Sequence, residues 1–189
     1  MIAAMNAFVT RLRTPLARFA IDCRGVSALE FSILAPMMLA LYLGSNEVTQ
    51  GIAIKRKVEL TAHALADLTS QQTSIDNADM TNIFNAATAI IAPYNANNLT
   101  AVVSEISIDA NGQGTVVWSS ATTNGAPLPL GQSVIVPSSL ATPNSYLILG
   151  QAAYSYNPTY GYVLTNTLTL SDQIFMLPRQ TNSVSRINS

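Results

Sequence analysis

Basic side chains are missing from most of this sequence, which has no lysine or arginine between Val58 and Pro178. Because nucleic-acid binding needs cations along a groove or face, we expect no nucleic-acid partner. Charged residues make up only 10% of the chain, well below the roughly 25% that is usual for soluble domains. A surface with so few charges relies on serine, threonine, asparagine and glutamine. These crowd the second half and suggest exposure outside the cytoplasm.

Cysteine is nearly absent as well, since Cys23 is the only one. A single cysteine excludes an intramolecular disulfide and argues against a thiolate metal cluster. The only histidine, His63, has no partner at a spacing that suits a metal site or a catalytic pair, so we expect it on a helix surface. No phosphate-binding loop is visible. The sequence therefore predicts no catalytic residue, no cofactor and no metal, and a protein that is not an enzyme.

One long apolar run, residues 26–44 (VSALEFSILAPMMLALYLG), is interrupted only by Glu30 and two serines. As a helix it would extend roughly 28 Å, about the thickness of a bilayer core. Arginines precede it, which by the positive-inside rule predicts a cytoplasmic N-terminus; the basic cluster at 55–57 lies too far beyond the run to weaken this much. An ordinary secretory signal peptide is the alternative, but Leu43 is large for the −3 position of a cleavage site.

The helical pattern continues beyond the apolar run. Apolar residues keep recurring at intervals of three and four, and the next proline after Pro36 is Pro93. The spacing predicts one helix over about 26–69, buried in the membrane in its first half and amphipathic in its second. A second helix is expected from an N-cap at Asp79 to Ala92, ended by the following proline.

Strand patterns follow the second helix. Alternating and β-branched residues bounded by turn residues predict strands at 99–108, 115–119, 134–136, 146–156 and 172–176. Residues 120–145 contain four prolines and are expected to form a long loop around the short third strand. The tail after Arg179 is predicted to be loose.

Two further features have a plain structural explanation. The turn-rich segment that starts at Asp109 lacks the acidic ligands of a calcium loop, so turn formation explains it better. Tyr154, Tyr156, Tyr160 and Tyr162 could form an adhesive or subunit-contact patch. Alternating aromatic residues on a strand favour core packing instead.

The residues at the start of the apolar run are the most informative. The string from Arg24 reads RGVSALEF, so a glycine and four further residues precede Glu30-Phe31 at the mouth of an apolar helix. This string resembles the processing site of Flp-type prepilins and their pseudopilins. The resemblance implies that a membrane aspartyl protease, the prepilin peptidase, cuts between Gly25 and Val26 and leaves Glu30 as the fifth mature residue.

The resemblance extends along the chain. Gly25-x-x-Ala28-x-Glu30-Phe31-x-x-x-x-Pro36 is similar to the opening of the TadE/TadG-like family of the Tad (Flp) type IV pilus system. No von Willebrand-type domain fits in this length, unlike the longer TadG-like members. Such a relationship implies other pilin subunits and the Tad inner-membrane assembly proteins as partners. Weaker similarities follow in order at Ser107–Ser119, Tyr154–Pro158 and Met176–Gln180.

Glu30 needs a charged partner whatever the family. A carboxylate inside an apolar span costs about 2.5–3.5 kcal/mol on insertion scales, and an ion pair at about 4 Å and an effective dielectric constant near 20 recovers roughly that amount. Cleavage after Gly25 would create an amine on Val26. That amine could pair with Glu30 of its own helix, or with Glu30 of the next subunit and so set the axial register, as proposed for type IV pilins. A shallow position with pairing to Arg24 is the alternative.

The expected fold is α+β and pilin-like, with a long N-terminal helix packed on a small antiparallel sheet of three or four strands. The order of helix and strands supports this, and the ladle shape of pilins is implied by the resemblance. The expected parts are a basic leader (1–25), a transmembrane segment (26–44), an amphipathic continuation of the helix (45–70), a periplasmic or extracellular α+β head (71–180) and a tail (181–189).

Two functions are compatible with this pattern. The first, implied by the resemblance, is a processed minor pseudopilin of the bacterial inner membrane and the pilus, acting in pilus assembly, surface attachment and biofilm formation. The second is an uncleaved bitopic inner-membrane protein whose head acts as an envelope scaffold or adhesin. In favour of the second, major Flp pilins are much shorter than this chain. The lipid bilayer is an expected partner in both.

Overall fold

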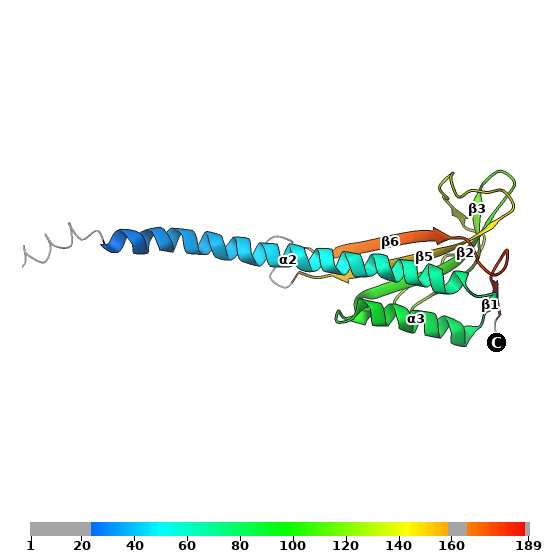
Figure 1. Cartoon of the computed structure of the whole chain (residues 1–189), viewed down its shortest axis with the longest axis horizontal. Coiled ribbons are helices and arrows are strands. Elements are labelled where there is room, and N and C mark those ends of the chain that lie inside the picture. The colour runs from blue at the N-terminus through cyan, green and yellow to red at the C-terminus, as the bar shows by residue number, and fades with distance from the viewer. Residues whose placement is uncertain (1–23, 159–165, 188–189) are drawn as a thin grey trace, which may run out of the picture. The chain divides into compact units, whose positions relative to one another are not determined.

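A single long helix, α2 (Arg24–Ser70), opens the part of the chain that the computed structural model describes, residues 24–158 and 166–187 (Figure 1). The helix predicted over 26–69 is confirmed, and Pro36 lies inside it without ending it. The boundary between two compact units, Met1–Ser45 and Asn46–Ser189, falls within this helix. The leader predicted for residues 1–25 lies almost wholly outside the described residues.

The second unit has the α+β architecture that the sequence predicts. Its sheet is antiparallel and has five strands in the order β4-β3-β2-β5-β6, while β1 and β7 form a separate parallel pair. The elements that follow α2 are β1 (Ser74–Ile75), α3 (Asn77–Ile91), the 3₁₀ turn η1 (Ala96–Asn98), β2 (Leu99–Ile108), β3 (Gly114–Ala121), β4 (Ser133–Val134), β5 (Tyr146–Tyr156), β6 (Leu168–Met176) and β7 (Ser185–Arg186).

The sheet has a buried apolar layer on each face. Side chains along β5 contribute to one layer or the other. Ile148, Ala152 and Tyr154 join the main core together with apolar residues of the second half of α2 and of α3. Leu147 and Leu149 belong to a smaller core on the other face, which the loop between β3 and β5 covers. Successive side chains of a strand point to opposite faces, so the consecutive apolar residues Leu147, Ile148 and Leu149 fit a part of β5 that is buried on both sides.

The closest approach between helix and sheet is at Gly150 of β5. A Cβ atom at this position would lie 2.5 Å from the carbonyl oxygen of Ala62 and 3.0 Å from the Cβ of Ala66. Both alanines are fully buried on the face of α2 that meets the sheet. Only a glycine on the strand and small residues on the helix allow backbones to come this close, because backbone atoms cannot move aside as a side chain can.

The basic cluster at 55–57 ties the second half of α2 to its neighbours. The Lys57 ammonium donates a hydrogen bond to the carbonyl oxygen of Ile90 at 2.9 Å, in the last turn of α3. Cations are favourable there because the carbonyl groups at a helix C-terminus carry partial negative charge. Lys55 donates to the carbonyl oxygen of Ser171 at 2.8 Å and pairs with the Asp172 carboxylate at 3.3 Å, both on β6. These lysines therefore position the helix against α3 and the sheet edge.

The start of α3 differs from the sequence prediction, in which Asp79 was the N-cap. The N-cap is Asp76, whose carboxylate accepts a hydrogen bond from the Asp79 backbone N–H at 2.7 Å. The Asp79 carboxylate in turn accepts from the Asp76 backbone N–H at 3.3 Å, which completes a capping box. In this motif the N-cap and the third helical residue are both polar, and the prediction chose the wrong member of the pair. The C-terminal end before Pro93 is confirmed.

The tail is also not loose, contrary to the prediction. Val184 is fully buried, and its backbone N–H and carbonyl oxygen both form hydrogen bonds. Its N–H donates to the Glu105 carboxylate at 2.6 Å, and its carbonyl oxygen accepts from the Trp118 indole N–H at 2.7 Å. β7 then pairs with β1. Sequence reasoning missed this segment because two-residue strands have no periodic pattern to detect.

The strand predictions hold with two differences. β2 and β5 match the predicted ranges, and β3 differs by a residue or two at each end. β6 begins at Leu168 rather than at Asp172, and the short strand predicted at 134–136 lies at 133–134 (β4). The sheet therefore has five strands instead of the three or four expected. Trp118, Tyr154 and Tyr156 are buried, as core packing requires, whereas Tyr160 and Tyr162 lie outside the described residues.

We expect Gly150→Ala to destabilise residues 46–189 by about 1–3 kcal/mol, because the added methyl group overpacks a backbone contact. Gly51→Ala is the matched control, since a Cβ there meets only the Tyr156 ring at 3.8 Å, an ordinary contact. Alanine is favoured over glycine inside a helix by about 0.5–1 kcal/mol, so this control should be neutral or stabilising. Trp118 fluorescence during urea unfolding reports both. Equal unfolding midpoints for Gly150→Ala and the unchanged chain would refute the contact.

The buried Glu105 carboxylate predicts a pH dependence of stability. Burial raises the pKa of Glu105, opposed in part by the Val184 N–H and by Trp118. A raised pKa means that the folded state holds the proton more tightly than the unfolded chain. The protonated Glu105 carboxyl therefore stabilises the folded state below about pH 4.5. This stabilisation is lost as the pH rises through the higher pKa of the folded state.

Glutamine keeps the shape and the acceptor oxygen but never ionises. The unfolding free energy of Glu105→Gln relative to the unchanged chain should therefore rise as the pH increases above about 4.5. Glu105→Ala should destabilise at every pH, because the Val184 N–H loses its acceptor. Urea unfolding at a series of pH values measures both. A pH-independent difference between Glu105→Gln and the unchanged chain would contradict the assignment.

Candidate processing and membrane-spanning site

The first half of α2 is apolar on every side and uncovered within its own unit. The most apolar window of the helix has a mean hydropathy of 1.8, and none of it is buried. Side chains all round the helix are exposed: Val26, Leu29, Phe31, Ile33, Leu34, Met37, Met38, Leu39, Leu41 and Tyr42. A helix that is apolar all round is either buried in a large core or placed in a membrane.

This segment meets the physical requirements of a membrane span. Residues 26–44 as helix cover roughly 28 Å, close to the thickness of a hydrocarbon core. A helix also satisfies its own backbone hydrogen bonds, which a span in lipid must do. α2 is the one described helix long and apolar enough to cross a membrane. α2 is therefore a candidate membrane span, and a transmembrane segment over 26–44 stays a prediction.

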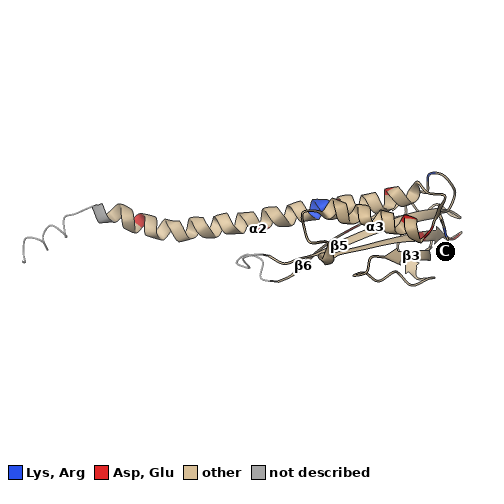
Figure 2. Cartoon of the chain, turned by 90° about the horizontal axis from the view of Figure 1, so that it is seen from below, with Lys and Arg blue, Asp and Glu red and all other residues tan. Residues whose placement is uncertain are grey.

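Glu30 lies one helical turn after Val26 and is exposed on the uncovered segment. It is the only charged residue of the run 26–44, and Figure 2 shows the first half of α2 almost entirely in the colour of uncharged residues. No described side chain forms an ion pair with it. The amine that cleavage would create on Val26 is four residues away, on the same helix face. The predicted partners of Glu30 remain predictions.

The predicted cleavage point lies at the start of the described part of α2, which extends from Arg24 to Ser70. Gly25 and Val26 are both helical there. A protease that needs the bond between them in an extended form would therefore have to unwind this part of the helix.

Pro36 and Phe31 complete the set of residues that the sequence selects. Pro36 lacks an N–H, so the carbonyl group of Ser32 receives no hydrogen bond from it. The sequence allows two interpretations of this proline: a point where the helix bends or melts on leaving the bilayer, or an ordinary tolerated proline. The helix is continuous through Pro36. Phe31 is 70% exposed, next to Glu30.

The other candidate residues have structural roles. His63 is exposed on α2, as predicted. Asp109 closes the turn between β2 and β3, where its carboxylate accepts hydrogen bonds from the backbone N–H groups of Asn111 and Gln113 at 2.9 and 2.7 Å. These bonds, with Gln113 the strongest, lower the pKa of Asp109. Among the described residues no group of His, Cys, Asp and Glu is arranged to hold a metal.

Two hollows on the second unit were not visible in the sequence. An apolar groove of about 480 Å³ runs between α2 and the edge strand β6, with Val48, Ile52 and Leu168 partly exposed in it. A polar hollow of about 580 Å³ lies between α3 and the turn after β3. Both depend on segments far apart in the chain, and no local pattern of residue types marks either of them.

No protein-family model matches the chain, and neither a curated protein nor a solved structure is detectably similar to it. The likeness to the TadE/TadG-like family therefore rests on the residues of the N-terminal motif and on the shorter motifs of the head. Its functional implications stand as proposals that experiments must test.

The uncovered segment predicts membrane association that depends on its apolar side chains. We expect the expressed full chain to sediment with membranes and to resist carbonate extraction. The double variant Leu34→Arg, Met38→Arg should shift it to the soluble or aggregated fraction, because each arginine near the centre of a span costs about 2.5–3.5 kcal/mol. Arginines at exposed Leu60 and His63, in the second half of α2, are the matched control. A double variant that still resists extraction would show that 26–44 is not the span.

Proposed function

We propose that this chain is a pilin-like minor pseudopilin of a Tad (Flp) type IV pilus. In this proposal a prepilin peptidase removes residues 1–25, and the mature chain acts in pilus assembly, surface attachment and biofilm formation. Its partners are other pilin subunits, the Tad inner-membrane assembly proteins and the lipid bilayer. The precursor lies in the inner membrane with its N-terminus in the cytoplasm and its head in the periplasm, and the head is extracellular once in the pilus.

One observation carries the proposal. Gly25 and Glu30 lie where the described part of α2 starts, Glu30 in its apolar and uncovered segment, and the second half of the same helix forms part of the core of an α+β unit. A subunit that waits in a membrane and then packs its apolar helix against copies of itself needs this combination.

Glu30 supports the same proposal. Between Val26 and Asn46 it is the only ionisable side chain besides Tyr42. A lone carboxylate in an apolar segment lowers membrane stability by about 2.5–3.5 kcal/mol, so a function must offset that cost. An amine on the cleaved Val26 of a neighbouring subunit supplies an attraction of the required size at about 4 Å. Such a pair forms only at one axial offset between subunits.

The test compares three chains in a strain that assembles Tad pili. N-terminal sequencing of the unchanged protein should give Val26 as the first residue. Gly25→Trp should leave only the precursor, because a protease that cuts after glycine must approach the backbone closely there. Glu30→Gln should be cleaved normally, since it lies beyond the cut, but should enter pili poorly because the charge is lost.

The readouts separate processing from assembly. Immunoblots give the cleaved fraction, and microscopy gives the number of pili per cell in the same cultures. An unchanged protein that begins at Met1 would refute the proposed cleavage. The uncleaved envelope scaffold or adhesin would then be the better explanation of the function. Normal piliation with Glu30→Gln would show that the carboxylate does not set register, and pairing with Arg24 would then explain it.

A further inference from the structure

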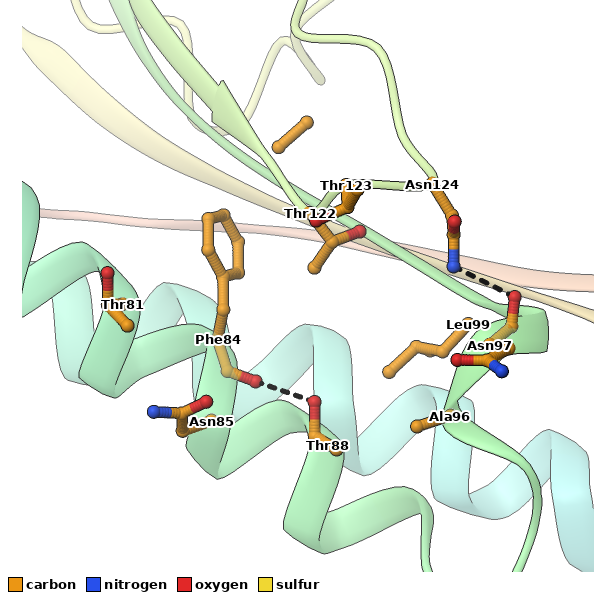
Figure 3. A pocket seen from close by; sticks show the side chains of 11 residues that line it. Thr81, Phe84, Asn85, Thr88, Ala96, Asn97, Leu99, Thr122, Thr123 and Asn124 are labelled. Carbon is orange, nitrogen blue, oxygen red and sulfur yellow. Dashed lines mark hydrogen bonds between the residues drawn. The ribbon is translucent and has the colours of Figure 1, made fainter.

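The polar hollow of the second unit has the size and construction of a ligand site. It lies between α3, the start of β2 and the turn that follows β3, and its volume of about 580 Å³ is within the range of about 300–1,000 Å³ typical of small-molecule sites (Figure 3). Its lining comes from three segments that are separate in the sequence. A hollow formed by three separate segments exists only in the folded protein, whereas a surface depression beside a single loop can form locally.

The walls carry no ionisable side chain. Three asparagines, four threonines, two alanines, Phe84 and Leu99 line the hollow. A phosphate, a carboxylate or a cation bound here would meet no opposite charge in the lining, so no ion pair would offset the hydration that it loses. The site therefore selects against charged ligands and suits a neutral molecule with many hydrogen-bonding groups.

The turn that forms one wall is held in place before any ligand arrives. The Asn124 side-chain amide donates a hydrogen bond to the carbonyl oxygen of Asn97 at 2.9 Å. The Thr122 backbone N–H donates to the carbonyl oxygen of Ala101 at 2.9 Å, and the Thr122 hydroxyl accepts from the Ala101 N–H at 3.1 Å. A preformed wall lowers the entropy cost of binding.

Other polar groups of the lining are uncommitted. No described residue forms a hydrogen bond with the side-chain amide of Asn85 or Asn97, or with the hydroxyl of Thr123. An amide side chain offers both donors and an acceptor, which matches a pair of neighbouring hydroxyl groups. In Figure 3 the Phe84 ring stands beside Thr122, and Leu99 extends from the opposite end. Leu99 is buried, so the half-buried Phe84 ring provides the apolar surface next to the free amides.

We propose that this hollow binds a neutral oligosaccharide. A sugar ring presents hydroxyl groups at its rim and C–H groups on its faces, so it needs amides and hydroxyls together with a flat apolar surface. Asn85, Asn97 and Thr123 supply the first, and Phe84 supplies the second. The site does not depend on the pseudopilin proposal, because every lining residue belongs to the unit 46–189.

The test uses the full chain purified in an amine-oxide detergent, because maltoside and glucoside detergents would compete for a sugar site. Titration calorimetry measures binding of three trisaccharides: a neutral glucose oligomer, a neutral N-acetylglucosamine oligomer and an acidic galacturonate oligomer. We expect at least one neutral oligomer to bind and the acidic one to bind at least tenfold more weakly. The two neutral arms distinguish plain from N-acetylated sugars as the source.

Variants assign the binding to the hollow. Asn85→Ala and Asn97→Ala should each weaken binding roughly three- to tenfold, as loss of a hydrogen bond does, and Thr123→Phe should abolish it by filling the space. Asn82→Ala is the matched control, since Asn82 is an exposed asparagine of α3 outside the lining. Circular dichroism confirms that each variant is folded.

Three results would overturn the proposal. They are no binding of either neutral oligomer at millimolar concentration, equal binding of the acidic oligomer, and equal weakening by Asn82→Ala and Asn85→Ala. None of them bears on cleavage after Gly25 or on pilus number. The two proposals can therefore fail separately.

Discussion

The approach of α2 to β5 at Gly150 is the constraint on which the second unit depends. The helix lies so near the strand that Ala62 and Ala66 face a position with no side chain. Larger apolar residues of the same helix, such as Ile54 and Leu65, then fill the space on either side of the contact. Since close-packed interiors tolerate little change in volume, the helix has one place in which it can lie. α3 is fixed in turn, through Lys57.

Scarcity of charge shapes the rest of the unit. Hydrogen bonds between hydroxyl groups connect neighbouring strands where other proteins often have ion pairs. The Ser104 hydroxyl is 2.8 Å from the Ser119 hydroxyl across β2 and β3, and the Ser107 hydroxyl is 2.9 Å from that of Thr115. Such pairs avoid the desolvation cost that a buried charge carries. Two carboxylates are exceptions, Glu47 at 1% and Glu105 at 2% exposed. Glu105 accepts a hydrogen bond from the backbone N–H of Val184, and this bond holds the C-terminal segment against the sheet.

The sequence predicted those parts of the fold whose pattern is local. α2 was predictable because apolar spacing of three and four continues for many turns, and β5 because its alternation is bounded by turn residues. The cap of α3 was missed because Asp76 and Asp79 are equally good candidates until their reciprocal bonds are seen. The tail and the polar hollow could not be predicted, since Val184 meets Trp118 and Asn97 meets Asn124 only after folding. The candidate processing site was found because its residues are adjacent in the chain.

The charges of α2 show how its two halves differ. In the second half Lys55 and Lys57 bind β6 and α3, and Asp67 pairs with Arg179. Each of these charges is explained by a contact within its own unit. Glu30 forms no ion pair with any described side chain, although it is in the segment where an isolated charge is most costly. In a membrane such a charge would need a partner from outside the described contacts: the amine that cleavage would create, the leader, or another molecule.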